Sequence, residues 1–141
     1  MTEYRCTWWE DTGSNSPFDA HGIARRIYRN CETGEETSDL PVAALLESPS
    51  GPRGSDGKSI VCVVPYAKDG SSNKTTWWHI DSRANNCTMP EDKEHRCWVR
   101  HGTLRGVIHV DKNGNTCAAG AGSISVPGFH GFLHHGVLRG D

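Results

Sequence analysis

The densest concentration of metal-binding and nucleophilic side chains lies between residues 77 and 132. This stretch holds three of the six cysteines and five of the eight histidines. Cysteine thiolates and histidine nitrogens are the ligands that zinc prefers in tetrahedral protein sites. If the loop of residues 87–95 folds back over a hairpin of residues 96–117, the sequence predicts a zinc site. Its expected ligands are Cys87, Cys97, His101 and Cys117.

Side-chain alternation along the expected strand supports this ligand set and provides one alternate. Residues two and four apart on a strand point to the same face, so Cys97 and His101 share a face and His95 joins them. We therefore keep His95 as the alternate ligand. The spacing from Cys87 to Cys97 is not the Cys-x-x-Cys spacing of a zinc ribbon. The competing interpretation is that the cysteines are small buried apolar residues.

Nucleophilic hydrolysis is the main catalytic alternative. A dyad could combine Cys87 or Cys97 with His130, or Ser123 with His130, and Asp81 could orient the histidine. The chain has no Gly-x-Ser-x-Gly elbow that would mark an activated serine. A metal-dependent or Cys/His hydrolase stays an alternative. Because the catalytic signature is missing, the sequence favours a protein that is not an enzyme.

Two glycine-containing segments predict special backbone. Asp69-Gly70 opens a turn, and residues 120–123 (GAGS) offer backbone N–H groups to an anion. The second segment lacks the lysine of a phosphate-binding P-loop, so it favours a general anion site over a nucleotide site.

A surface for a ligand or partner is expected where the loop of residues 81–97 meets the strand ends at His101 and His130. Adjacent tryptophans on one strand point to opposite faces, so one member of each pair faces away from a one-sided core. The residues expected on this surface are Trp77, Trp78, His79, Asp81, Arg83, Asn85, Asn86, Ser123 and His130.

Charge and hydropathy exclude several classes of protein. The net charge is −2 with acids and bases interspersed, so no basic stripe predicts nucleic-acid binding. The longest apolar run, residues 60–65, is far too short to span a membrane. The first eleven residues lack the pattern of a signal peptide, which predicts a cytosolic chain with thiols or metal ligands in place of disulfides.

Composition predicts an α+β fold that is mainly β. Hydrophobic residues make up 35% of the chain and glycine occurs 16 times, which favours short strands and loops over a helical bundle. We expect a compact antiparallel sheet and hairpin domain with short N-terminal helical turns. The predicted organisation is an N-terminal subdomain at 1–47, a linker or long loop at 48–58 and a β-rich core domain at 59–141.

Local patterns place the elements within these parts. Residues 4–9 predict a short aromatic strand, residues 20–29 one or two helical turns or a short strand, and residues 42–47 a short helix that starts after Asp39-Leu40-Pro41. Asn113-Gly114 favours a type I′ hairpin turn. Strands are predicted at 59–66, 75–80, 96–101, 106–111, 123–126, 129–133 and 137–138.

A short sequence that begins with histidine occurs twice in the chain. Residues 101–106 (HGTLRG) recur as residues 135–140 (HGVLRG). The simpler interpretation is a reused strand–turn–strand element. The alternative is a set of histidines presented at strand ends that converge on one site.

The residues of the core block resemble a known group of proteins. The segments 78–87 (WHIDSRANNC), 95–102 (HRCWVRHG), 111–124 (DKNGNTCAAGAGSI) and 130–133 (HGFL) are similar to small phage-encoded proteins of the actinobacteriophage type. Some of those proteins carry an ammonia monooxygenase label. The resemblance covers about residues 50–138 and implies a viral origin and a small β-rich fold. It implies no activity.

Three functions from different classes follow from these patterns. We expect a non-catalytic phage accessory or binding protein, with zinc as a structural cofactor and a host protein, a phage protein or a small ligand as partner. A virion component, such as a capsid decoration or tail-associated protein, is the second. The hydrolase is the third. The expected location is the host cytoplasm, or the virion for a structural component.

Overall fold

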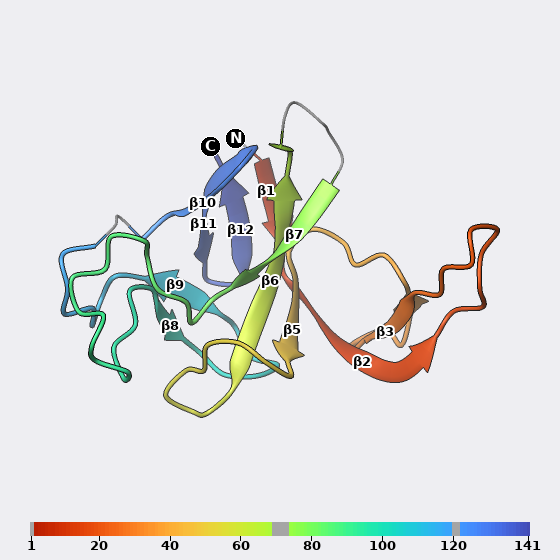
Figure 1. Ribbon diagram of the computed structural model, residues 1–141, viewed down its shortest axis with the longest axis horizontal. Helices are drawn as coiled ribbons and strands as arrows, with labels where there is room; N and C mark the ends of the chain where they lie inside the picture. Colours follow the sequence, from red (N-terminus) through yellow and green to blue (C-terminus); the bar gives the residue numbers. More distant parts are fainter. Residues whose placement is uncertain (1, 69–73, 120–121) are drawn as a thin grey trace.

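The computed structural model describes residues 2–68, 74–119 and 122–141, which form three β-sheets (Figure 1). A four-stranded sheet has the order β1-β12-β11-β10, a six-stranded sheet the order β4-β3-β2-β5-β6-β7, and β8 and β9 form a hairpin. The strands are β1 (Thr2–Arg5), β2 (Thr7–Asn15), β3 (Arg26–Asn30), β4 (Glu36–Thr37), β5 (Ala44–Ser48), β6 (Ser59–Tyr66), β7 (Lys74–His79), β8 (Val99–His101), β9 (His109–Asp111), β10 (Ile124–Val126), β11 (Phe129–His134) and β12 (Val137–Gly140).

Strand β6 is the centre of the molecule because both of its faces are buried. Ile60, Cys62 and Val64 point into the main core, while Val61 and Val63 point into a second cluster with Trp9 and Leu46. A strand covered on both faces needs a continuous apolar run instead of an alternating one. The prediction of a buried strand over residues 59–66 and its hairpin with β7 is confirmed.

The main core lies between the two large sheets and the β8–β9 hairpin. Leu133 and Leu138 of the four-stranded sheet, Leu45 of the six-stranded sheet and Ile108 and Val110 of the hairpin region belong to one buried cluster. The hairpin therefore packs on the core through apolar residues. Its position fixes where the loops at its ends can lie.

The N-terminal segment belongs to both large sheets. Strand β1 pairs with β12, and after Cys6 strand β2 pairs with β5 and β3. The residues predicted as a linker, 48–58, connect β5 to β6 in an antiparallel hairpin in which Ser48 pairs with Ser59. Strands from both predicted parts of the chain thus lie in the same sheets (Figure 1).

The predicted N-terminal helical turns are wrong. No α-helix occurs in the part of the chain that the structure describes. Residues 42–47 mostly form β5, and the helix is blocked because Ala43 has a positive φ of 70° and donates its N–H to the Val63 carbonyl. Arg26–Asn30 form strand β3, the other outcome that the pattern of residues 20–29 allowed.

The turn at residues 112–115 differs from the predicted type. Gly114 has a φ of 104°, but Asn113 is not among the residues with positive φ, and the Asn115 N–H bonds the Lys112 carbonyl at 3.0 Å. Positive φ at the third turn residue alone corresponds to type II, whereas type I′ requires it at both central residues. The chain then enters the loop that carries Cys117. The predicted turn at Asp69-Gly70 and residues 120 and 121 of the predicted anion site lie outside the described residues.

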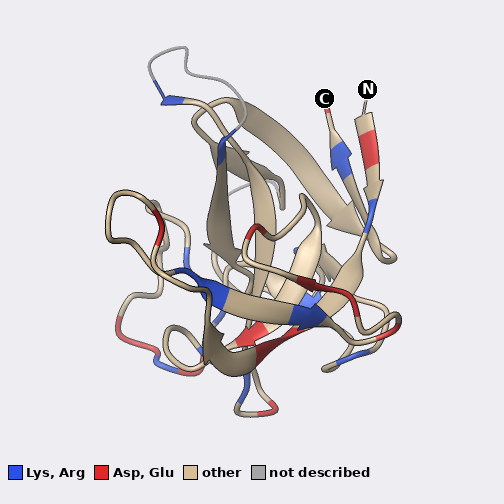
Figure 2. Ribbon diagram, turned by 90° about the vertical axis from the view of Figure 1, so that its right-hand side faces the viewer, with Lys and Arg blue, Asp and Glu red and all other residues tan. Residues whose placement is uncertain are grey.

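The adjacent tryptophans point to opposite faces, as expected from strand geometry. Trp8 packs on the main core and Trp9 on the second cluster. Trp78 likewise packs on the main core, against Trp98, while Trp77 is 39% exposed. Lysine and arginine are intermixed with aspartate and glutamate over the elements seen in Figure 2. Among the described residues, no helix combines the length and apolar character that crossing a bilayer requires.

Candidate metal centre

The β8–β9 hairpin brings two long loops together. In the antiparallel pair, Val99 at the start of β8 lies opposite Asp111 at the end of β9. The loop of residues 81–98 enters the hairpin and the loop of residues 112–123 leaves it at this same end (Figure 1). Cys97 lies two residues before β8 and Cys117 six residues after β9, so the pairing of the strands places both cysteines in one region.

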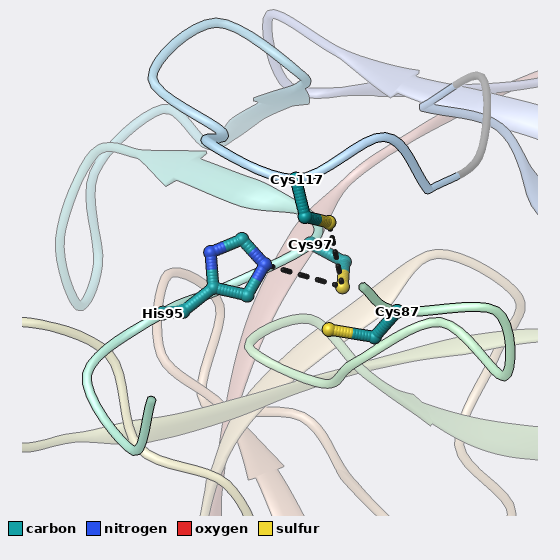
Figure 3. Close-up of side chains that lie close together, drawn as sticks. All are labelled: Cys87, His95, Cys97 and Cys117. Atoms are coloured by element: carbon teal, nitrogen blue, oxygen red, sulfur yellow. Dashed lines mark hydrogen bonds between the residues drawn. The ribbon is translucent and has the colours of Figure 1, made fainter. Parts of the chain in front are cut away.

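Four potential metal ligands converge at this end of the hairpin. They are Cys87, His95, Cys97 and Cys117, and one ligand atom from each lies within 4.8 Å of all the others. Cys97 Sγ is 3.6 Å from His95 Nε2 and 3.8 Å from Cys117 Sγ (Figure 3). His95 and Cys97 are buried, and all four side chains point toward a common centre. This group could bind a metal ion.

The structure brings together the three predicted cysteines and the alternate histidine, and it places His101 elsewhere. The imidazole of His101 bonds Asp111, with Nε2 2.8 Å from Oδ1. Cys97 and His101 are four residues apart, which corresponds to about 13 Å along an extended chain. Sharing a face is therefore not sufficient for two side chains to bind one ion. His95 is only two residues from Cys97, and the side chains can span that distance.

Cys87 and Cys117 lie in similar turns. In each turn a backbone N–H two residues later donates to the sulfur: Met89 N–H to Cys87 Sγ and Ala119 N–H to Cys117 Sγ, both at 3.4 Å. The two turns are also joined directly, because the Ala118 N–H bonds the Thr88 hydroxyl at 3.1 Å. N–H groups that point at sulfur favour the thiolate, which is the form that binds metal.

The pKa of the thiol is shifted in opposite directions at Cys117 and Cys97. Burial raises the pKa of the Cys117 thiol, but the backbone N–H groups of Ala119 and Thr88 outweigh this effect, together with His95 and Cys97, and hold the pKa at about 5. For Cys97, burial dominates and raises the pKa. The site thus contains one thiol that is ionised at neutral pH before any ion binds, and a positive ion would favour ionisation of the others.

Residues outside the four ligands orient them. His95 Nδ1 is 3.3 Å from the Thr116 hydroxyl, and that hydroxyl lies 3.1 Å from Met89 Sδ. If Nδ1 donates to Thr116, the unprotonated Nε2 faces the sulfurs, which is the arrangement that metal-binding histidines adopt. The guanidinium of Arg83 bonds the carbonyls of Met89 and Asp92 and so holds the loop around Cys87.

Two surface hollows are lined by members of the ligand group. Cys87 lines one hollow together with Arg83 and Pro90. His95 and Thr116 line another.

A buried ion-pair network lies beside the second hollow. The Arg100 side chain is 5% exposed and bonds Asp81, which is 3% exposed at its side chain, and the more open Asp56. Burial raises the pKa of Asp81 although Arg100 opposes the effect. Hydrogen bonds from Arg100 hold the pKa of Asp56 at about 2. Asp81 therefore links the start of the loop of residues 81–98 to β8.

The strand residues predicted for a partner surface lie in different environments. Trp77 is the exposed one and makes an edge contact with Tyr28, with ring centroids 6.0 Å apart. Trp78 packs on the main core and Asp81 is buried. The ring of His79 lies close to Gly51, and its buried Nδ1 has no hydrogen-bond partner among the described residues.

The remaining predicted surface residues are also separated. Asn85 and Asn86 are exposed on the loop of residues 81–98. Arg83 is half-buried and bonds backbone carbonyls of the same loop. The Ser123 carbonyl accepts a hydrogen bond from the Trp98 indole at 3.1 Å. His130 on β11 is exposed and bonds Asp141 at 2.6 Å. This contact with Asp141 occupies the Nδ1 atom of the histidine expected in the hydrolytic dyads.

Thr116 and the N–H groups of Met89 and Ala119 are functional groups that sequence reasoning missed. The position of Thr116 directly before Cys117 is a signal that the sequence contains. Its contact with His95 joins residues 21 positions apart and depends on the folded loops. Comparison of the chain with protein-family models, with curated proteins and with solved structures finds no match. The evidence for function therefore comes from the site itself.

Proposed function

We propose that this chain is a small, non-catalytic binding module of phage origin whose loops are held by a structural zinc ion. The observation that carries the metal assignment is the convergence of Cys87, His95, Cys97 and Cys117 within 4.8 Å of one another. Three sulfurs and one imidazole nitrogen form a ligand set that zinc prefers.

The spacing of the ligand atoms supports a tetrahedral ion. Zinc–sulfur bonds of about 2.3 Å and zinc–nitrogen bonds of about 2.05 Å at tetrahedral angles separate two sulfurs by about 3.8 Å and a sulfur and a nitrogen by about 3.6 Å. The Cys97–Cys117 and Cys97–His95 distances are 3.8 Å and 3.6 Å. These two pairs of ligand atoms are already at the separations that a bound zinc ion requires.

Four protein ligands favour a structural role over a catalytic one. Catalytic zinc sites keep one coordination position for water or substrate, whereas structural sites close all four with protein atoms. The ligands come from two segments, between β7 and β8 and between β9 and β10, whose described residues form no strand. An ion at this position would cross-link these loops and order the surface around Asn85 and Asn86.

Metal content and ligand substitutions test the proposal. Purified protein should contain about one zinc ion per chain by elemental mass spectrometry, and the partly exposed thiols of Cys87 and Cys117 should be protected from a thiol reagent. His95→Ala should lose most of the bound zinc because it removes one of the four ligands. His101→Ala is the matched control and should keep it.

Two outcomes would contradict the assignment. Absence of metal, with the Cys87 and Cys117 thiols open to the reagent, would exclude the site. Zinc loss in His101→Ala with retention in His95→Ala would show that the ligand set is different. Cobalt substitution separates the functional classes. Addition of azide should leave the cobalt absorption spectrum unchanged if the site is closed, whereas a shifted spectrum would favour the metal-dependent hydrolase.

A further inference from the structure

A row of aromatic rings crosses the surface where the β8–β9 hairpin meets the four-stranded sheet. His109 on β9 occupies its centre. Its ring centroid lies 4.2 Å from that of His135, 4.7 Å from that of His134 and 5.7 Å from that of His101. His101 and His135 are the first residues of the two copies of the repeated sequence, so both copies bring a histidine to His109.

Hydrogen bonds fix the protonation state of His109. The backbone N–H of His135 lies 3.3 Å from His109 Nδ1, and a backbone N–H can only donate, so Nδ1 must accept. Nε2 lies 2.9 Å from Asp111 Oδ2, and a neutral ring with its proton on Nε2 donates to that carboxylate. This assignment uses both ring nitrogens and holds the imidazole neutral.

His135 lies in a turn whose backbone is strained. The residue has a φ of 50° and Gly136 a φ of 78°, which gives the two-residue turn between β11 and β12 positive φ at both central positions. Only glycine adopts such angles without cost. The stacked His109 ring and the His135 N–H to Nδ1 bond offset that cost, and the Gly136 N–H to Ile108 carbonyl bond at 2.8 Å adds a second attachment to the region of β9.

We propose that the His135 N–H to His109 Nδ1 bond is a pH-sensitive latch that opens the turn of residues 134–136 from β9 when His109 Nδ1 takes up a proton. A proton on Nδ1 would replace the acceptor with a donor, and two N–H groups would then face each other. The latch is independent of the proposed zinc site because none of its groups is a metal ligand or lies within two residues of one.

The charges around His109 determine the direction of the effect. Asp111 is the carboxylate that bonds the cluster among the described residues, and its pKa is about 2, since bonds from the Asn113 N–H, His101 and His109 outweigh the opposing effect of burial. It stays ionised as His109 takes up a proton and can offset one imidazolium. The other titratable or charged groups around the cluster are His101 on β8, His134 on β11, His135 in the turn and Arg139 on β12.

His134 shows that additional protons are disfavoured in the folded protein. Burial lowers its pKa, and the neighbouring His109, His135 and Arg139 lower it further. Below about pH 6.5 the unfolded chain therefore binds more protons at His134 than the folded chain does. The stability linked to His134 is present above that pH and is lost as pH falls through the folded pKa, which is the direction that favours opening of the latch.

Hydrogen–deuterium exchange of the full chain tests the latch. Between pH 7.5 and 5.5, after correction for the intrinsic exchange rate, protection of the peptide that covers residues 134–137 should fall about tenfold, while that of β5 and β6 should stay constant. In His109→Asn the side-chain oxygen can accept from the His135 N–H and does not titrate. This variant should keep its protection at pH 5.5.

A second variant keeps the test decisive if His109→Asn does not fold. His134→Phe retains a ring at that position but removes a titrating neighbour, so it should shift the loss of protection to lower pH. Constant protection of residues 134–137 in the wild-type chain would overturn the proposal. So would an equal loss in wild type and His109→Asn, because that loss would come from another group, such as a metal ligand that becomes protonated.

Discussion

At the scale of single residues, each functional side chain depends on what its remaining polar atoms contact. His95 faces the sulfurs through Nε2 because Thr116 lies against Nδ1, whereas His101 lies outside the group of ligand atoms and bonds Asp111. The two nitrogens of His109 likewise have different partners. Identical imidazoles therefore differ in what they can do because their neighbours differ.

The buried Arg100 network gives an asymmetric prediction. Arg100→Leu leaves the Asp81 carboxylate buried without a partner, and we expect a loss of about 3–5 kcal/mol in the free energy of unfolding. Asp81→Asn should cost less, about 1 kcal/mol, because Arg100 keeps its two bonds to Asp56. Urea unfolding of both variants measures the difference. Equal losses would show that Asp56 does not hold Arg100 in the absence of Asp81.

At the scale of elements, a central strand can be predicted from the sequence where burial alone determines its residue pattern. Residues 60–64 are all apolar because both faces of β6 are covered. A helix is predicted at residues 42–47, which include most of β5, because Asp39-Leu40-Pro41 has the pattern of a helix start. The place of β5 between β2 and β6 overrides that local signal, and no local pattern contains this information.

The burial of β5 predicts a large effect of truncation. Leu45 is 1% exposed and lies in the main core, so Leu45→Ala should lower the free energy of unfolding by about 2–5 kcal/mol. Val107, which is 69% exposed in the loop between β8 and β9, is the control, and Val107→Ala should change stability by about 0.5 kcal/mol or less. Denaturant unfolding with an unchanged slope checks both. A small effect at Leu45 would contradict the central place of β5.

The candidate metal centre was predictable by residue type and only partly by position. Three cysteines in one stretch with several histidines identify the ligands that zinc prefers. Side-chain alternation along a strand predicts the face on which a residue lies but not the distance between two side chains. The choice between His95 and His101 as the ligand therefore depends on where β8 starts. The contact between Thr116 and His95 depends on two loops that meet only after β8 and β9 pair.

At the scale of the whole molecule, the proposed zinc ion should contribute to global stability. Its ligands connect loops on both sides of the β8–β9 hairpin, and that hairpin contributes Ile108 and Val110 to the main core. Removal of the ion with a chelator should lower the melting temperature by about 10 °C, as expected for a ligand present at roughly 1,000 times its Kd.

Calorimetry with and without chelator measures this shift, and re-addition of zinc should reverse it. Cys97→Ser is the matched control, since it should melt at the lower temperature and show no further response to chelator. An unchanged melting temperature in the wild-type chain would mean that no ion couples the loops to the fold.

The pairing of β1 with β12 also determines when the fold can be completed. Thr2 lies opposite Gly140, and the two ends lie side by side in Figure 1. During synthesis, β1 is made long before β12 and has no partner in its sheet until β12 follows, which leaves an unpaired strand edge during that interval. Contacts between such distant residues raise the contact order, and we expect folding to be slow and to finish only after β12 is available.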